Sequence, residues 1–195
     1  MSLNEHAVLK HALPIGPGPL VLVVGPSGAG KDTLLDIARA HLAVNGRVHF
    51  ARRLVTRPAG SGEAHGTLSL DEFAARYDEF ALSWQAHGLS YALGPEVTAQ
   101  IRAGDVVVAN GSRATLPLAR QRFSRLFVVH VTAPVAVRAA RLAARGREAE
   151  EDIRERLERA PQIDLQPDLV LENVGPPEVC GARLADFIAT LTPQT

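Results

Sequence analysis

A glycine-rich segment directly behind an apolar run constrains this chain more than any other feature. The apolar run Leu20–Val24 is followed by the segment and then by helix-forming residues up to 38. Strand, glycine-rich loop and helix in this order form the context that a phosphate-binding P-loop requires. Glycines let the backbone approach a phosphate closely, and the loop N–H groups and the start of the helix face the anion. We therefore predict that the phosphates of a nucleoside triphosphate are held by Gly25, Pro26, Ser27, Gly28, Ala29, Gly30, Lys31, Asp32 and Thr33.

Asp32 departs from the usual P-loop pattern, in which Ser or Thr follows the lysine and places its hydroxyl on magnesium. A carboxylate in the first turn of a helix suits the helix dipole. Beside a triphosphate, however, it would be repelled unless a cation lay between them. We expect Asp32 to hold Mg²⁺, directly or through water, because Mg²⁺ keeps its waters readily. The alternative is that Asp32 caps the helix and Thr33 serves the metal.

Length, charge and cysteine content limit the class of protein. A chain of 195 residues with 46% hydrophobic content can bury a core, and its length favours one domain. The formal net charge of zero argues against a nucleic-acid partner. No apolar run approaches the length of a membrane span and no signal peptide is visible, so we expect no membrane partner. The single Cys180 excludes an internal disulfide and favours a cytoplasmic location. The oligomeric state is left open.

Apolar runs alternate with helical patterns, which predicts an α/β fold with a mostly parallel sheet in three layers. Five strands are expected, at Leu20–Val24, Val48–Arg52, Asp105–Val108, Leu126–Val131 and Leu169–Leu171. Helices are expected at Thr33–Ala38, from Ser69 (with a capping box to Glu72) through Tyr77, and at Glu96–Ala103, Val135–Ala144, Glu150–Arg159 and Glu178–Leu191.

Two segments interrupt this alternation. Residues 56–66 are rich in glycine and small side chains and lead into an irregular strand at 81–91, so an acceptor-binding insertion is expected at about 53–94. A basic stretch from Arg141 to Arg147 precedes the acidic residues 148–152, which predicts a lid at about 141–156. Residues 1–18 are expected to form a flexible leader, and 19–195 a single domain.

Phosphoryl transfer requires in-line positioning and positive charge over the moving group. Lys31, a magnesium ion and arginines from the lid would supply that charge, so the predicted catalytic residues are Lys31, Arg141, Arg145 and Arg156. The alternative for the three arginines is a solvated helix face paired with neighbouring glutamates.

Several motifs resemble those of the guanylate-kinase superfamily, over about residues 20–192. They are G-P-S-G-A-G-K, Thr56-Arg57, Gly62-Glu63, His87-Gly88 with Tyr91, and R-x-x-x-R-G at Arg141–Gly146. The resemblance implies a P-loop kinase fold with a separate acceptor region and a mobile lid. It also implies that Arg57 grips the acceptor phosphate and that Asn173 lies near the adenine, although Asn173 could instead cap the last strand.

Four departures from that superfamily concern the acceptor. The second phosphate-gripping arginine of guanylate kinases is Gly60 here, and their guanine-reading glutamate is Leu82. A hydroxyl residue is replaced by Leu93, and a second acidic residue on the middle strand by Asn110. A site that reads a base through hydrogen bonds loses its specificity when those bonds are removed. The expected acceptor is therefore not a guanine nucleotide.

The segments Leu82–Tyr91, Asn110–Arg113 and G-K-D-T-L-L more closely resemble the ribose 1,5-bisphosphate phosphokinase family of phosphonate degradation. This resemblance implies transfer of the γ-phosphoryl group of ATP to the 1-phosphate of ribose 1,5-bisphosphate, giving 5-phospho-α-D-ribose 1-diphosphate. The implied acceptor-binding residues are Arg57, Trp84, His87, Tyr91, Asn110, Ser112 and Arg113. The carboxyl ends of parallel strands, where Asn110–Arg113 would lie, are where ligands bind.

Alternatives remain open for these residues and for the function. Arg113 could be a surface arginine, and Trp84 and His87 could be core residues of the insertion. A nucleoside-monophosphate kinase is the first rival function, against which Leu82 and Gly60 argue. A non-catalytic binding module of the same superfamily is the second, against which the presence of Lys31 and the lid arginines argues.

Overall fold

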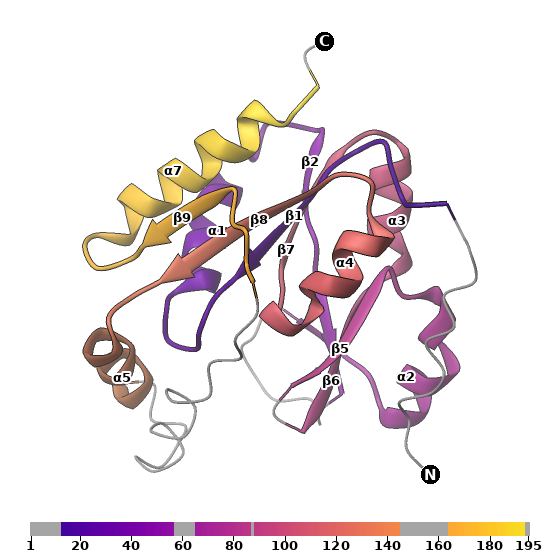
Figure 1. The fold of residues 1–195 in the computed structure, drawn as a ribbon, viewed down its shortest axis with the longest axis horizontal. Helices are drawn as coiled ribbons and strands as arrows, with labels where there is room; N and C mark the ends of the chain where they lie inside the picture. Colours follow the sequence, from indigo (N-terminus) through magenta and orange to yellow (C-terminus); the bar gives the residue numbers. More distant parts are fainter. Residues whose placement is uncertain (1–12, 57–64, 87, 145–163, 194–195) are drawn as a thin grey trace.

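Five parallel strands form the central sheet of the computed structural model, which describes residues 13–56, 65–86, 88–144 and 164–193. Their order is β2–β7–β1–β8–β9 (Figure 1). The strands are β1 (Leu20–Val24), β2 (Val48–Phe50), β7 (Val106–Asn110), β8 (Leu126–Thr132) and β9 (Leu169–Glu172). All five expected strands are present and every pairing between them is parallel, which confirms the predicted α/β fold.

A second, four-stranded sheet occupies the expected insertion, in the order β4–β3–β6–β5. Its strands are β3 (Arg53–Val55), β4 (His65–Thr67), β5 (Leu82–Ala86) and β6 (Leu89–Leu93). The expected irregular strand at 81–91 is in fact a regular antiparallel hairpin, in which Gly88 (φ 71°) provides the left-handed turn. Between β4 and β5 lie α2 (Leu70–Ala75) and a 3₁₀ turn, η2 (Tyr77–Glu79).

The capping box predicted at the start of α2 is confirmed. Glu72 N–H donates to Ser69 Oγ over 3.1 Å, and Ser69 N–H donates to Glu72 Oε2 over 2.7 Å. Burial of Phe73 against Phe80 and Ala92 then fixes this short helix on the small sheet.

Residues 13–18 are attached to the domain. Ile15 is 8% exposed, its N–H donates to Arg122 O over 2.8 Å, and its carbonyl accepts from Ser124 N–H over 2.9 Å. This part of the expected leader therefore packs on the body, while residues 1–12 and the expected helix at 150–159 lie outside the described residues.

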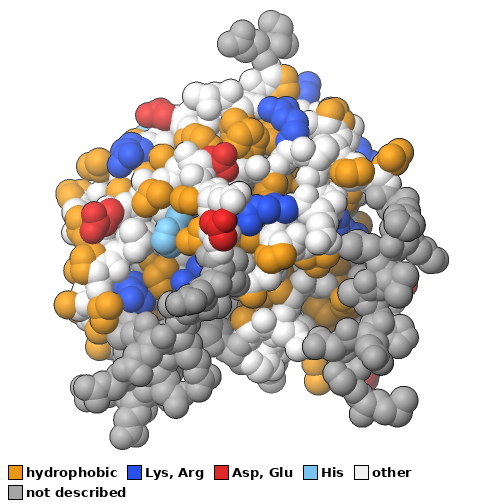
Figure 2. Space-filling model, viewed as in Figure 1, with side chains coloured by type: hydrophobic (Ala, Val, Ile, Leu, Met, Phe, Trp, Pro, Cys, Tyr) orange, Lys and Arg blue, Asp and Glu red, His pale blue; other side chains and the backbone are white. Residues whose placement is uncertain are grey.

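One face of the molecule shows how side chains of different types are distributed. On the face drawn in Figure 2, basic, acidic and apolar side chains are interspersed, in keeping with the zero net charge. No helix in the described part of the chain is long and apolar enough to cross a membrane.

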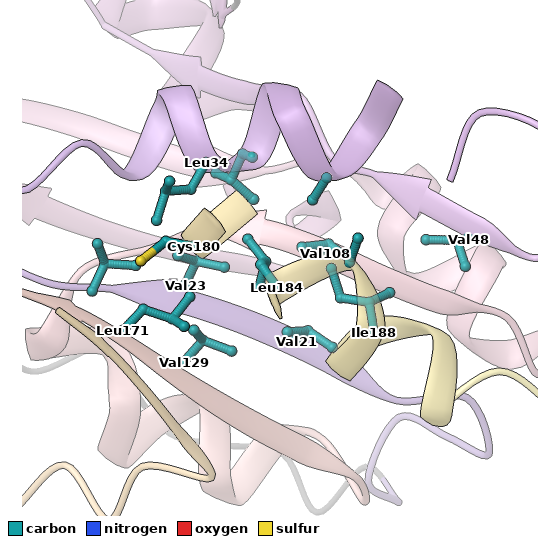
Figure 3. Packing of buried hydrophobic residues seen from close by; sticks show 14 of the residues in the cluster. Val21, Val23, Leu34, Val48, Val108, Val129, Leu171, Cys180, Leu184 and Ile188 are labelled. Carbon is teal, nitrogen blue, oxygen red and sulfur yellow. The ribbon is translucent and has the colours of Figure 1, made fainter. Parts of the chain in front are cut away.

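The main core lies on both faces of the parallel sheet, which makes the three predicted layers. One face packs against α1 (Lys31–His41) and α7 (Pro177–Thr190), where Val21, Val23 and Val108 meet Leu34 and Leu184 (Figure 3). The other face packs against α3 (Pro95–Arg102) and α4 (Leu116–Arg122). Because side chains alternate along a strand, neighbours in sequence point to opposite layers.

Candidate active site

The glycine-rich segment connects the carboxyl end of β1 to α1, as the P-loop prediction requires (Figure 1). Lys31 is the first residue of α1, and its Nζ donates to Gly25 O over 2.9 Å and to Pro26 O over 3.1 Å. Its ammonium therefore lies over the loop. The first turn of α1 follows Gly30, whose left-handed φ of 91° favours glycine.

Asn173 and Arg141 come from distant parts of the chain to the same point of this loop. Asn173 follows β9 and is 2% exposed; its Nδ2 donates to Ala29 O over 2.9 Å. Arg141 extends from α5 (Val135–Ala144), and its Nη1 donates to the same carbonyl over 3.5 Å. The Asn173 side chain thus contacts the loop rather than capping β9. Its buried Oδ1 has no hydrogen-bond partner among the described residues.

Asp32 and Asn110 meet on the α1 side of the sheet. Asn110 ends β7, next to Val23 of β1, and its Nδ2 donates to Asp32 Oδ1 over 2.5 Å. Asn110 Oδ1 is buried and has no partner among the described residues, while the Asp32 and Thr33 side chains are exposed. An oxygen-rich pair of this kind fits Mg²⁺, which prefers oxygen ligands and usually binds one or two carboxylates together with substrate phosphates. No group of three or more His, Cys, Asp or Glu that could hold a metal is found among the residues described.

The small sheet brings two of the predicted acceptor residues together. Trp84 and Tyr91 pair across the β5–β6 hairpin, and their rings stack with centroids 5.6 Å apart and planes inclined by 14°. The Arg53 guanidinium lies 5.1 Å from the Tyr91 ring centre. Thr56 is 7% exposed and is anchored by the bond from Ser90 N–H to its Oγ1, 2.9 Å long.

Several predicted residues lie outside the described part of the chain. These are Arg57 and His87 of the acceptor region and Arg145 and Arg156 of the lid. The lid therefore remains a prediction beyond Ala144.

Ser112 and Arg113 follow Asn110 at the carboxyl end of β7. Ser112 Oγ accepts from Ala114 N–H over 3.3 Å and caps the 3₁₀ turn η3 (Arg113–Thr115). Arg113 is half-buried, and burial, with a smaller contribution from the charge of Arg138, lowers its pKa. Its guanidinium makes no hydrogen bond or ion pair within the described residues, so a freely solvated surface arginine is a poor description of it.

Two basic residues at this site escaped the sequence prediction. Arg138 is 8% exposed, and its Nε donates to Ala133 O over 3.1 Å. A Cβ on Gly28 would lie 2.8 Å from Arg138 O, so α5 packs directly on the P-loop. His130 of β8 is half-buried, and its pKa is lowered by burial, then by the charges of Arg113 and Lys31.

A signal for both residues exists in the sequence. Arg138 lies three positions before Arg141, so both share one face of the helix, and Leu142 at the next helical position marks that face as buried. His130 interrupts an otherwise apolar strand just before that strand's carboxyl end, where sites form in parallel sheets.

Two of the positions at which the resemblance to guanylate kinases implied a base contact are core positions here. Leu82 and Leu93 face each other across the hairpin and are 1% and 0% exposed. Both belong to the cluster that packs on the α3 and α4 face of the main sheet.

Comparison with solved structures supports the fold. A guanylate kinase from Anaplasma phagocytophilum superposes with a TM-score of 0.62 at 14% identity, covering 92% of this chain and 89% of that one. A sugar kinase from a Janibacter species gives a TM-score of 0.51 at 18% identity, covering 91% of this chain and 100% of the other. At these identities the likeness concerns the P-loop kinase fold alone.

Comparison with known sequences is more specific, although no family model matches the chain. A protein of Bradyrhizobium diazoefficiens named ribose 1,5-bisphosphate phosphokinase PhnN is 46% identical over 177 residues, 89% of each chain. Proteins of the same name from a Chelativorans species and from Rhizobium etli are 43% and 50% identical, over 94% and 74% of this chain and 91% and 75% of theirs. The chain therefore belongs to the ribose 1,5-bisphosphate phosphokinase family.

Proposed function

We propose that this chain transfers the γ-phosphoryl group of ATP to the 1-phosphate of ribose 1,5-bisphosphate. The products are 5-phospho-α-D-ribose 1-diphosphate and ADP. The observation that carries the proposal is the 46% identity to a protein of that name across 89% of both chains. The proposal includes a role in phosphonate breakdown and a cytoplasmic location, which the single cysteine favours.

In this reaction, an oxygen of the 1-phosphate bonds to the γ-phosphorus of ATP. The bond from that phosphorus to the β–γ bridging oxygen breaks, and its electron pair leaves with ADP. No covalent bond to the protein forms, so the protein contributes positioning and electrostatic stabilisation. Lys31, at the start of α1, is suited to neutralise charge on the outer phosphates.

The nucleotide side of the site is assigned to the P-loop and the residues that contact it. The loop N–H groups and the start of α1 bind the phosphates. Arg141 and Asn173 both contact Ala29 O, so they can order the loop and reach the bound nucleotide. In the proposed active state, Arg145 and Arg156 complete the positive charge when the lid closes.

Asp32 and Asn110 would hold Mg²⁺, through their oxygen atoms or through water. When bound, the ion would neutralise charge on the β- and γ-phosphates. Asn110 holds the Asp32 carboxylate through its Nδ2 and keeps its own Oδ1 without a partner among the described residues.

The acceptor side favours a sugar phosphate over a nucleotide. Leu82 and Leu93 are buried and have no side-chain group that could hydrogen-bond to a base. The half-buried Arg113 and the stacked Trp84–Tyr91 pair are proposed to bind the acceptor together with Ser112, Arg57 and His87, whereas Asn110, which bonds to Asp32 on the α1 side, is proposed to serve the metal instead. A bisphosphate without a base requires basic groups rather than a base-reading carboxylate.

A product assay tests the proposal. The purified chain is incubated with ATP, Mg²⁺ and ribose 1,5-bisphosphate, and ³¹P NMR follows the appearance of the diphosphate of 5-phospho-α-D-ribose 1-diphosphate. GMP replaces the sugar phosphate in a parallel reaction. We expect the diphosphate with the sugar and little ADP with GMP; efficient GMP phosphorylation without sugar turnover would overturn the proposal.

A further inference from the structure

We propose that His130, Arg113 and Arg138 form an anion subsite that binds one phosphate group of the acceptor, beside the P-loop and on the sheet face opposite Asp32. The inference rests on the proposed function in one respect, that the acceptor is a phosphorylated molecule. It adds two residues, His130 and Arg138, to the binding site, and it gives Arg113 defined neighbours.

The position of His130 follows from strand register. It pairs with Val24, the residue that directly precedes the P-loop. Val24 and Val128 both belong to the core cluster on the α3 and α4 face, and alternation puts the His130 side chain on that same face. Asn110 points to the other face, where it bonds to Asp32 of α1. The two groups of polar residues are therefore separated by the sheet.

Arg113 reaches the same face from the end of β7, which is separated from β8 by β1. It begins the η3 turn that leads from β7 into α4, and α4 covers this face of the sheet. Its guanidinium is half-buried and makes no hydrogen bond or ion pair with any described residue, and the same holds for the His130 ring. Burying a charged group without a partner is costly, so the arrangement favours an anion that supplies the partner.

Arg138 is the most buried member of the cluster, at 8% exposed. Its Nε–H donates to Ala133 O, and its remaining guanidinium N–H groups make no hydrogen bond with the residues described. The backbone of Arg138 packs on Gly28, so α5 holds this arginine against the P-loop. An arginine held in this way presents fixed donors, which suits phosphate recognition.

The electrostatics agree with this geometry. Arg138 lies near enough to lower the pKa of Arg113, and Arg113 and Lys31 lie near enough to lower that of His130. In both residues burial is the larger cause. β9 borders His130 through Val170, and the carboxylate of Asp168, which directly precedes β9, accepts from Val128 N–H over 2.7 Å. No carboxylate in the described part of the chain contributes to either shift.

The position of the subsite indicates that it binds the acceptor rather than ATP. The triphosphate is expected to bind to the loop N–H groups and the start of α1. The η3 turn that carries Arg113 contacts β5 of the small sheet, which carries Trp84. The cluster therefore lies between the P-loop and the acceptor-binding insertion.

His130 would act as a hydrogen-bond donor whose protonation follows binding. Its lowered pKa favours the neutral ring, which can donate one N–H to a phosphate oxygen. A phosphate dianion beside it stabilises the protonated ring, so binding raises the pKa of His130 and takes up a proton.

An NMR titration of the full chain tests this inference. Protein with ¹³C,¹⁵N-labelled histidine is saturated with Mg·ADP, so that the P-loop is occupied, and inorganic phosphate is then added. His130→Gln identifies the His130 signals by their loss. We expect phosphate to raise the pKa of His130, and Arg113→Gln to weaken phosphate binding about ten- to a hundred-fold.

Two control variants match these changes. His41→Gln, at the exposed far end of α1, and Arg102→Gln, exposed at the end of α3, should leave phosphate binding unchanged. In turnover assays, His130→Gln should raise the KM of the acceptor about tenfold, in line with a hydrogen bond to a charged group, while the KM of ATP stays the same.

Three results would overturn the inference. They are a His130 pKa that phosphate does not move, phosphate binding that neither His130→Gln nor Arg113→Gln weakens, and a non-hydrolysable Mg·ATP analogue that alone produces the full pKa rise. The last would assign the subsite to the donor. A chain that binds phosphate as expected but does not phosphorylate ribose 1,5-bisphosphate would refute the proposed function and keep the subsite.

Discussion

At the scale of single residues, the loop backbone positions the Lys31 ammonium. The ammonium is held over the loop by the Gly25 and Pro26 carbonyls, where it can meet the charge of the transferring group. We expect Lys31→Ala to lower kcat/KM about 100- to 1,000-fold, the effect of losing one preorganised donor. The thermal midpoint should change little, because the side chain is only half-buried. Activity within a few-fold of the unmodified chain would remove Lys31 from the catalytic residues.

Asp32 tests the proposed metal site. Asp32→Asn removes the charge that attracts Mg²⁺ but can keep the contact with Asn110, so it should raise the Mg²⁺ concentration needed for half-maximal activity about tenfold or more. Asp32→Ser should partly restore the response, because a hydroxyl is the usual ligand at this position. The matched control is Asp36→Asn, an exposed residue one turn later on α1, paired with Arg39. Equal Mg²⁺ titrations for the Asp32 and Asp36 variants would reduce Asp32 to a helix cap.

His130 also links stability to pH. Its pKa is lowered in the folded state, so the unfolded chain binds the proton more readily and stability falls as pH drops through about 6.5. The loss levels off below the folded-state pKa. In urea unfolding at a series of pH values, His130→Gln should lose less stability than the unmodified chain as the solution is acidified. His41→Gln controls for the substitution itself; parallel pH curves for the His130 variant and the unmodified chain would contradict this linkage.

At the scale of elements, hydrophobic patterning predicted the parts of the molecule that are long and buried. The five core strands and the capping box at Ser69 follow from local sequence. The short elements were missed. β3 and β4 have only three residues each, and three of the seven residues of α4 are polar, which weakens its apolar pattern. Arg138 and His130 were missed for another reason. Their importance depends on which elements meet at the P-loop, and that is a property of the tertiary fold.

The contact between α5 and the P-loop can be tested through Gly28. Its φ is 78°, and a Cβ there would press on the backbone of Arg138. Gly88 offers a matched control, with φ 71° and, apart from its chain neighbours, no atom of the described residues within 4 Å of its Cβ position. Gly88→Ala should cost about 1–2 kcal/mol of stability from the left-handed backbone alone. Gly28→Ala should cost more and weaken ATP binding at least about tenfold, because α5 or the loop must move; equal losses in urea unfolding and unchanged ATP titrations would contradict this.

At the scale of the whole molecule, the sheet divides the proposed chemistry into two sides. Asp32 and Asn110 lie on the α1 side, where the metal is proposed, and Arg113 and His130 lie on the α4 side, next to the insertion. The P-loop at the end of β1 joins both. Because the proposed acceptor side is formed by side chains of the insertion and of the β7–α4 turn, the fold by itself does not determine which acceptor is bound. The likeness to a guanylate kinase at 14% identity concerns the fold alone, whereas Leu82 and Leu93 are buried side chains of this chain without a polar group.

The acceptor range of the whole enzyme follows from this division. GMP should be a very poor acceptor, because Leu82 and Leu93 offer no hydrogen bond to guanine, and ribose 5-phosphate should yield no diphosphate, because it lacks the receiving phosphate.

Arg113→Ala should lower kcat/KM for ribose 1,5-bisphosphate about ten- to a hundred-fold, the effect of a charge-assisted bond of about 1.5–3 kcal/mol, while ATP affinity stays constant. Arg102→Ala, exposed on α3, is the control. Initial rates over a matrix of ATP and acceptor concentrations separate the two effects. An Arg113 variant with unchanged acceptor kinetics would exclude this arginine from the site, and rapid turnover of GMP would show that the base is read by residues other than those two leucines.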